Sequence, residues 1–273
     1  MNLNGIYGDR MLTDLHCHLL PGIDDGSKSM DQSLAMARIA VADGITTTVV
    51  TPHHLNGVYR NPARRIREGI EQVNAALQSA GIGLNLLPGS ELHLTPELPG
   101  ELADGTALTI ANQGRAVLVE LPVHTVPVGA EQLLDDIIAQ RLTPVIAHPE
   151  RNSELRRTPE RLSEWVQMGC LAQVTVQSCT GQFGEAVQQA ARTMVRQGSI
   201  HVAASDAHRD RRRVPRITPA LEPLSAWTNE TVARLLVETY PTDLAAGRAP
   251  DLELLRSALP ARRTPWWRKL VGA

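Results

Sequence analysis

Five of the nine histidines in this 273-residue chain lie where a predicted β-strand ends. Four acidic residues also lie at or shortly after the ends of predicted strands. Together they make nine candidate metal ligands: His16, His18, Asp25, His53, Glu91, Glu120, His148, Asp206 and His208. Imidazole and carboxylate suit Mn, Fe or Zn, and the set contains no thiolate. The sequence therefore predicts a metal site built from nitrogen and oxygen ligands.

Two spacings indicate that these ligands act together. His16 and His18 form an H-x-H pair, and Asp206 with His208 forms a D-x-H pair. Side-chain direction repeats every two residues in extended backbone, so each pair points to one face. A lone histidine at a strand end is more often structural, but two such pairs among nine ligands favour a cluster of two or three ions. We expect such a cluster to attract a phosphate dianion and to ionise a bridging water, which would be the nucleophile.

The elements that must position these ligands alternate along the chain. Short apolar, β-branched runs predict strands, and the segments between most of them have helical spacing. The predicted strands are 11–16, 45–51, 84–87, 116–121, 143–147, 171–176 and 200–204, and the predicted helices are 29–43, 61–81, 130–140, 158–168 and 182–197. Asn61 is the expected N-cap of the second helix, and the irregular stretch 92–114 is expected to be an insertion. Strand–helix alternation predicts an α/β fold with a parallel sheet, closed or nearly closed into a barrel whose active site lies at the strands' carboxyl ends.

Composition limits the remaining possibilities. The net charge of −2 gives no general field for nucleic acid, and three scattered cysteines do not make a disulfide framework. No apolar run has the length of a membrane span, and the N-terminus lacks a signal-peptide core, so a cytoplasmic location is expected. We divide the chain into a leader (1–10), a single domain (11–260) and a basic, tryptophan-containing tail (261–273). That tail suits weak contact with a membrane surface, contact with a partner, or simple packing.

Several longer motifs resemble those of a known family. DLHCHLLPGIDDG, TPHH, GSELHL, VELP, IAHPERN and ASDAHRD are similar to the motifs of the PHP (polymerase and histidinol phosphatase) superfamily. The closest resemblance is to its manganese-dependent protein-tyrosine phosphatases from bacterial capsule and exopolysaccharide gene clusters. The resemblance extends from about residue 11 to about residue 215.

The resemblance implies a distorted (β/α)7 TIM-like barrel that binds three divalent ions, with Mn²⁺ expected and Fe or Zn as alternatives. It implies one ion held by His16, His18, Glu91 and Asp206; a second by Glu91, Glu120 and His148; and a third by Asp25, His53 and His208. It also implies that Arg151 and Arg213 bind the substrate phosphate. Neighbouring arginines leave the second position open to Arg211 or Arg212.

For two other residues near the motifs, the sequence leaves two interpretations open. His54 either supports the site or faces away from it, and Asp24 either adjoins the site or forms a turn. We interpret His93, His124 and His201 as surface or packing residues.

The expected function is hydrolysis of phosphotyrosine on a protein, with the tyrosine-rich tail of a polysaccharide-export kinase as the expected substrate. A metal-bridging hydroxide would attack in line. The cysteines argue against a cysteine-phosphatase mechanism, because none of Cys17, Cys170 and Cys179 begins a C-x5-R sequence. One alternative is a phosphatase acting on histidinol phosphate or another small phosphomonoester. Another is a metal-binding regulatory protein without catalysis.

Overall fold

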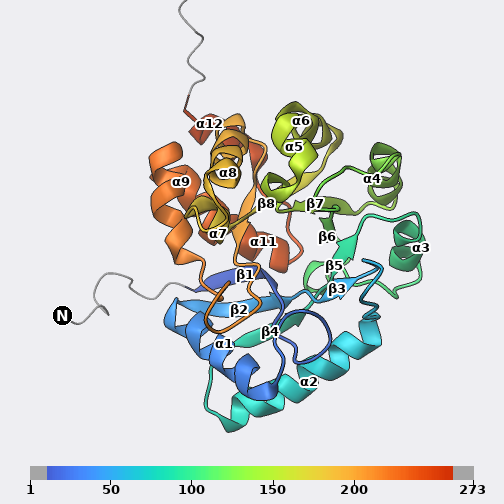
Figure 1. Ribbon diagram of the computed structural model, residues 1–273, viewed down its shortest axis with the longest axis vertical. Helices are drawn as coiled ribbons and strands as arrows, with labels where there is room; N and C mark the ends of the chain where they lie inside the picture. Colours follow the sequence, from blue (N-terminus) through green and yellow to red (C-terminus); the bar gives the residue numbers. More distant parts are fainter. Residues whose placement is uncertain (1–10, 261–273) are drawn as a thin grey trace, which may run out of the picture.

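A computed structural model describes residues 11–260 and contains nine parallel strand segments in two sheets (Figure 1). The first sheet has the order β1-β2-β4 and the second β3-β5-β6-β7-β8-β9. The strands are β1 (Leu12–Cys17), β2 (Ile45–Val50), β3 (His53–His54), β4 (Asn85–Pro88), β5 (Glu91–His93), β6 (Ala116–Glu120), β7 (Thr143–Ala147), β8 (Leu171–Thr175) and β9 (Val202–Ala204). The leader 1–10 and the tail 261–273 lie outside the described residues.

Backbone contacts link the two sheets at both ends. Glu91 N donates to the carbonyl of Pro52 at 3.1 Å, which continues the pairing of β2 with β4 into that of β3 with β5. At the other end, Cys17 and Ala207 form a parallel bridge, so the segment after β9 lies beside β1. All strand pairs are parallel, so the carboxyl ends that carry the candidate ligands lie on one side.

Helices follow most strands and cover the sheets (Figure 1). They are α1 (Met30–Ala42), α2 (Ala63–Ser79), α3 (Leu98–Ala103), α4 (Ala130–Ala139), α5 (Ser153–Arg157), α6 (Pro159–Met168), α7 (Val176–Cys179), α8 (Glu185–Gln197), α9 (Leu221–Trp227), α10 (Glu230–Arg234), α11 (Tyr240–Ala245) and α12 (Leu252–Ala258). A π-helical turn, Leu235–Thr239, joins α10 to α11. None of the described helices is long and apolar enough to cross a membrane.

The residues at the starts of α1 and α2 have different roles. Ser29 caps α1 as its side chain accepts from Gln32 N. The expected Asn61 cap of α2 is wrong: Pro62 holds the N-cap position, and the Asn61 side chain instead donates to the carbonyls of Ile23 and His53. Asn61 therefore fastens the loop after β1 to β3.

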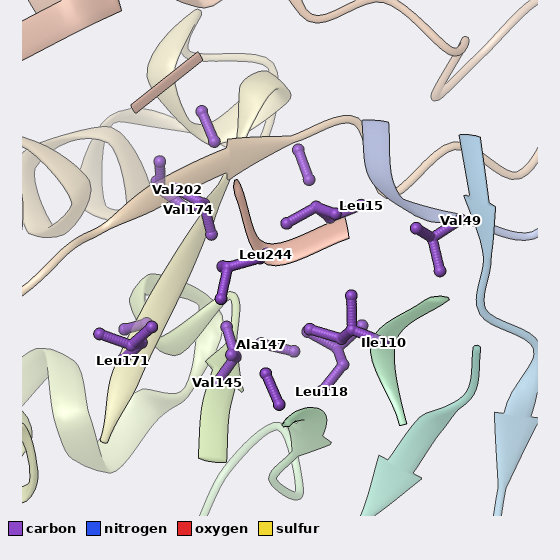
Figure 2. Packing of buried hydrophobic residues seen from close by; sticks show 14 of the residues in the cluster. Leu15, Val49, Ile110, Leu118, Val145, Ala147, Leu171, Val174, Val202 and Leu244 are labelled. Atoms are coloured by element: carbon purple, nitrogen blue, oxygen red, sulfur yellow. The ribbon is translucent and has the colours of Figure 1, made fainter. Parts of the chain in front are cut away.

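Leu, Val, Ile and Ala side chains make up most of the core. Figure 2 shows Leu244 of α11 among the side chains of Val145, Leu171 and Leu15, which come from β7, β8 and β1. Leu244 and Leu171 are 4% and 3% exposed, so this helix covers apolar strand residues that would otherwise face water.

The predicted α/β fold with parallel strands is confirmed, and the expected strand positions agree with β1, β2, β4 and β6 to β9 within two residues. The strand count differs: β3 and β5 are short segments that follow Pro52 and Gly89, where no apolar run marks a strand. The stretch 92–114 contains the end of β5 and the short helix α3.

Candidate metal centre

His16 and His18 form the middle of the site. They lie at and just after the end of β1, and their Nε2 atoms are 3.1 Å apart. The Nδ1 atom of His16 lies 2.8 Å from Gln173 Oε1, and that of His18 lies 2.7 Å from Asp24 Oδ2. Since an amide oxygen and a carboxylate accept hydrogen bonds, both Nδ1 atoms are donors, and both Nε2 atoms carry lone pairs when the rings are neutral.

Two buried carboxylates complete this part of the site. Glu91 Oε2 is 3.2 Å from Nε2 of His16 and 3.2 Å from Nε2 of His18. Asp206 Oδ1 is 3.4 and 3.5 Å from the same two atoms. Four side chains from β1, β5 and the loop after β9 therefore point their donor atoms at one small volume.

A second group lies beside it. His18, Asp25, His53 and His208 bring one ligand atom each to within 4.8 Å of one another. Asp25 Oδ1 is 3.4 Å from Nε2 of His53 and 3.4 Å from Nε2 of His208. The Nδ1 atom of His208 donates to the carbonyl of Asp206, which leaves its Nε2 facing the group.

Glu120 and His148 also adjoin Glu91, and Glu120 Oε2 lies 3.4 Å from Nδ1 of His53. His148 Nε2 is 2.9 Å from Glu91 Oε1 and 3.9 Å from Glu120 Oε1. His53, Glu91 and Glu120 form one further ligand set, and His16, His148 and Asp206 another. The structure thus brings all nine predicted ligands together. The resemblance implied that Glu91, Glu120 and His148 hold the second ion. These three residues are not one of the groups whose ligand atoms all lie within 4.8 Å of one another.

Both predicted arginines reach the same carboxylate. Arg151 Nη1 and Arg213 Nη2 each lie 2.5 Å from Asp206 Oδ2, the oxygen opposite to the one facing the histidines. The Arg151 guanidinium also lies 5.1 Å from the ring centre of Phe183, the only phenylalanine of the chain. Arg211 and Arg212 are exposed. Asp206 therefore separates the ligand cluster from two cationic groups.

The buried charges shift one another's pKa values. Burial alone would raise the pKa of Asp206, but Arg213 and His16 hold it well below the usual range. Burial would likewise raise the pKa of Glu91, yet His16 and His53 lower it strongly. Burial, with the neighbouring His18, lowers the pKa of His208 to about 4, so that ring is neutral at pH 7 and available as a ligand.

Several residues that sequence reasoning passed over support the ligands. Asp14, two residues before His16 on the same strand face, is fully buried and accepts from Ser205 N and Oγ, which ties β1 to the segment after β9. Gln173 fixes the ring of His16, and Arg209 donates to the carbonyls of Asp25 and Gly26. Asp14 could have been identified from the sequence, because it precedes His16 by two residues and so lies on the same face of the strand.

The structure shows the contacts of Asp24 and of the four histidines that were not predicted as ligands. Asp24 adjoins the site through His18, and His54 pairs with Glu101 at 2.6 Å. His93 Nδ1 lies 3.6 Å from Glu120 Oε2. His201 is buried away from the ligands and accepts from Ala172 N, whereas His124 is exposed.

The donor set fits divalent cations. Two imidazole lone pairs facing each other at 3.1 Å repel unless a cation or a proton lies between them. Glu91 Oε2 and Asp25 Oδ1 are also buried without a hydrogen bond from any residue in the described part of the chain. Unpaired buried carboxylate oxygens are costly, and coordination of a metal removes that cost.

The fold and the site define an α/β protein of parallel strands with a candidate His/Asp/Glu metal centre at the carboxyl ends of those strands. A family model described as "Capsular polysaccharide synthesis, CpsB/CapC" matches residues 12–245. The chain belongs to this family.

Relatives and solved structures agree with that membership. The tyrosine-protein phosphatase YwqE of Bacillus subtilis is 42% identical over 72% of this chain and 77% of its own length. The tyrosine-protein phosphatase CpsB of Streptococcus pneumoniae is 30% identical over 77% of this chain and 88% of its own. A crystal structure from a study of YwqE and CpsB, described as metal-dependent tyrosine phosphatases, superposes with a TM-score of 0.83 at 36% identity, covering 88% of this chain and 96% of that one. The Escherichia coli phosphotriesterase homology protein, at 11% identity and a TM-score of 0.56, covers 88% of this chain and shares the fold alone.

Proposed function

We propose that this chain is a metal-dependent protein-tyrosine phosphatase. One observation carries the proposal: Asp206 presents one oxygen to His16 and His18 and the other to Arg151 and Arg213. Phosphate-binding cations thus adjoin the predicted metal cluster, as hydrolysis of a phosphate monoester requires. Activities of the relatives YwqE and CpsB support the same reaction class.

The chain's own residues bind and orient the substrate in this proposal. Arg151 and Arg213 present planar guanidinium groups that can each donate two hydrogen bonds to phosphate oxygens. Divalent ions held by these ligands would neutralise phosphate charge and lower the pKa of a bound water. Gln173 and Asp24 hold the imidazoles of His16 and His18 with Nε2 towards the cluster.

A cysteine nucleophile is not used in this mechanism. Cys17, Cys170 and Cys179 are free and buried, and burial raises the pKa of the Cys17 thiol well above its usual range. A thiol that remains protonated at neutral pH is a poor nucleophile.

The proposal includes the finer expectations from sequence. Three divalent ions bind, with Mn²⁺ expected, and the nine ligands divide among them as the resemblance implies. The two linked sheets act as one distorted (β/α)7 barrel within a single domain spanning 11–260. The substrate is the phosphotyrosine of a polysaccharide-export kinase tail, and the protein works in the cytoplasm.

A comparison of substrates tests the reaction class. Metal-loaded protein should hydrolyse a phosphotyrosine peptide with a higher kcat/KM than histidinol phosphate or the matched phosphoserine peptide. A preference for histidinol phosphate would assign the protein to small-molecule phosphatases. Binding of metal without turnover of any of the three would assign it to the regulatory class.

A further inference from the structure

A pocket of about 360 Å³ lies at the end of the strands opposite to the metal cluster. Its walls include Ala116, Thr143 and Leu171, which are the first residues of β6, β7 and β8. The candidate ligands Glu120 and His148 lie at the other ends of β6 and β7. The pocket is therefore separate from the site described above.

All the charged side chains that line this pocket are arginines: Arg115, Arg141 and Arg248. Arg248 pairs with Asp243 at 2.7 Å. Arg115 and Arg141 form no ion pair with any residue between 11 and 260. Since the lining carries no acid, two guanidinium charges remain available to an anion at this site.

Arg141 also adopts an unusual backbone conformation. Its φ of +64° lies in the left-handed region, directly after the C-cap of α4, where glycine is the common residue. A side chain in this region is disfavoured relative to glycine. A long cationic residue thus occupies a position that favours glycine, and it lines the pocket.

The floor of the pocket is apolar. Ala116, Leu171 and Leu244 contribute to it and are 1%, 3% and 4% exposed. Figure 2 shows Leu171 beside β8 and Leu244 on α11. Gly169 and Gly247 add stretches of lining without side chains. An apolar floor beneath cationic side chains is typical of sites for small organic anions, and the volume lies in the usual range for ligand pockets.

We propose that this pocket binds a small organic phosphate. Arg115 and Arg141 bind the phosphoryl group, because guanidinium forks match phosphate oxygens. Leu171 and Leu244 contact the apolar part of the ligand. Occupancy of this site is independent of the proposed phosphatase chemistry.

The probe for this site is phenylphosphonate, which joins a phosphoryl anion to an apolar ring and has no ester bond to hydrolyse. Metal-loaded protein, prepared with a diamagnetic divalent ion and labelled at leucine methyls, is titrated while the Leu171, Leu244 and Leu252 resonances are followed by NMR. These three leucines line the pocket, so their shifts report this site and not the metal cluster. Methylphosphonate serves as a probe without the ring.

The double variant R115A/R141A should weaken the binding that these methyls report at least tenfold. The matched control R65A/R67A removes the same charge from exposed positions on α2 and should leave the affinity unchanged. Phenylphosphonate should bind more tightly than methylphosphonate. Three results would overturn the proposal: no saturable shift of these methyls in wild type, equal affinity in R115A/R141A and wild type, or equal weakening in both double variants.

Discussion

Arg151 and Asp206 are joined by a contact of 2.5 Å between Nη1 and Oδ2, although 54 residues separate them along the chain. The pair connects the turn after β7 with the loop after β9. It holds the guanidinium at the border of the ligand cluster. Burial opposes the ionisation of both groups, but the Asp206 carboxylate raises the pKa of Arg151, and Arg213 and His16 hold the pKa of Asp206 well below its usual range, so both groups stay charged.

Replacing Arg151 tests its role in binding phosphate. Arg151→Ala should lower kcat/KM for a phosphotyrosine peptide about 100-fold, the typical loss when a charged donor to a transition state is removed. Arg151→Lys should restore only part of it, because an ammonium group cannot form the planar fork. Bound metal, measured by elemental analysis, should not change. Arg212→Ala, at an exposed neighbouring position, is the matched control, and an equal loss there would contradict the assignment.

Phe183 should act as a positioning residue for Arg151. Phe183→Leu removes the ring beneath the guanidinium and should lower kcat/KM about three- to fivefold, which corresponds to roughly 0.5–1 kcal/mol for a cation–π contact. Phe183→Tyr should retain wild-type activity. Loss of metal from Phe183→Leu, or failure of Phe183→Tyr to retain activity, would show a general structural role instead.

Gln173 should affect metal affinity rather than the chemical step. Gln173→Leu leaves His16 Nδ1 without its acceptor, and loss of such a partner typically weakens metal binding 10- to 100-fold. Activity should fall at limiting Mn²⁺ and recover at saturating Mn²⁺. Gln182→Leu, at an exposed position, should leave the metal dependence unchanged. A Gln173→Leu activity that saturating metal does not recover would contradict this role.

His201 should give folding stability a pH dependence of its own. Burial, with a smaller effect of Arg256, lowers its pKa from 6.5 to about 4. The unfolded chain therefore takes up the proton first, and the contribution of His201 is complete above pH 6.5 and is lost as the pH falls towards 4. The free energy of unfolding should drop by about 3 kcal/mol across that window from this group.

Urea unfolding at pH 7 and pH 5 measures this effect. His201→Asn keeps an acceptor for Ala172 N but does not titrate, so its stability should fall less than that of wild type. His124→Asn, at an exposed position, should behave as wild type does. Equal losses in wild type and His201→Asn would contradict the prediction.

The grouping of the candidate ligands could be predicted from the sequence more readily than the shortest strands of the fold. Apolar runs marked where strands such as β7 end, and side chains at those ends must converge in a parallel arrangement, so the clustering of His148 with Glu91 followed from position alone. β3 and β5 could not be found that way. They have only two and three residues, and each contains a candidate ligand, so they are too short and too polar to show the periodicity that marks a strand.

The supporting residues were harder to predict for a different reason. Gln173 lies inside a buried strand, where a lone polar residue has no characteristic spacing, and its partner His16 is 157 residues away. Asn61 has the sequence pattern of a helix cap but binds backbone carbonyls from two other segments. Such long-range hydrogen bonds depend on tertiary packing, which local sequence does not encode.

The most direct test of the metal-dependent phosphatase is hydrolysis of a phosphotyrosine peptide in three states: with Mn²⁺, after chelation, and after Mn²⁺ is restored. His148→Ala, checked for folding by circular dichroism, is measured alongside. Activity should disappear on chelation, return with Mn²⁺, and be absent from His148→Ala at the same metal concentration. Activity that survives both chelation and the His148→Ala substitution would contradict the account.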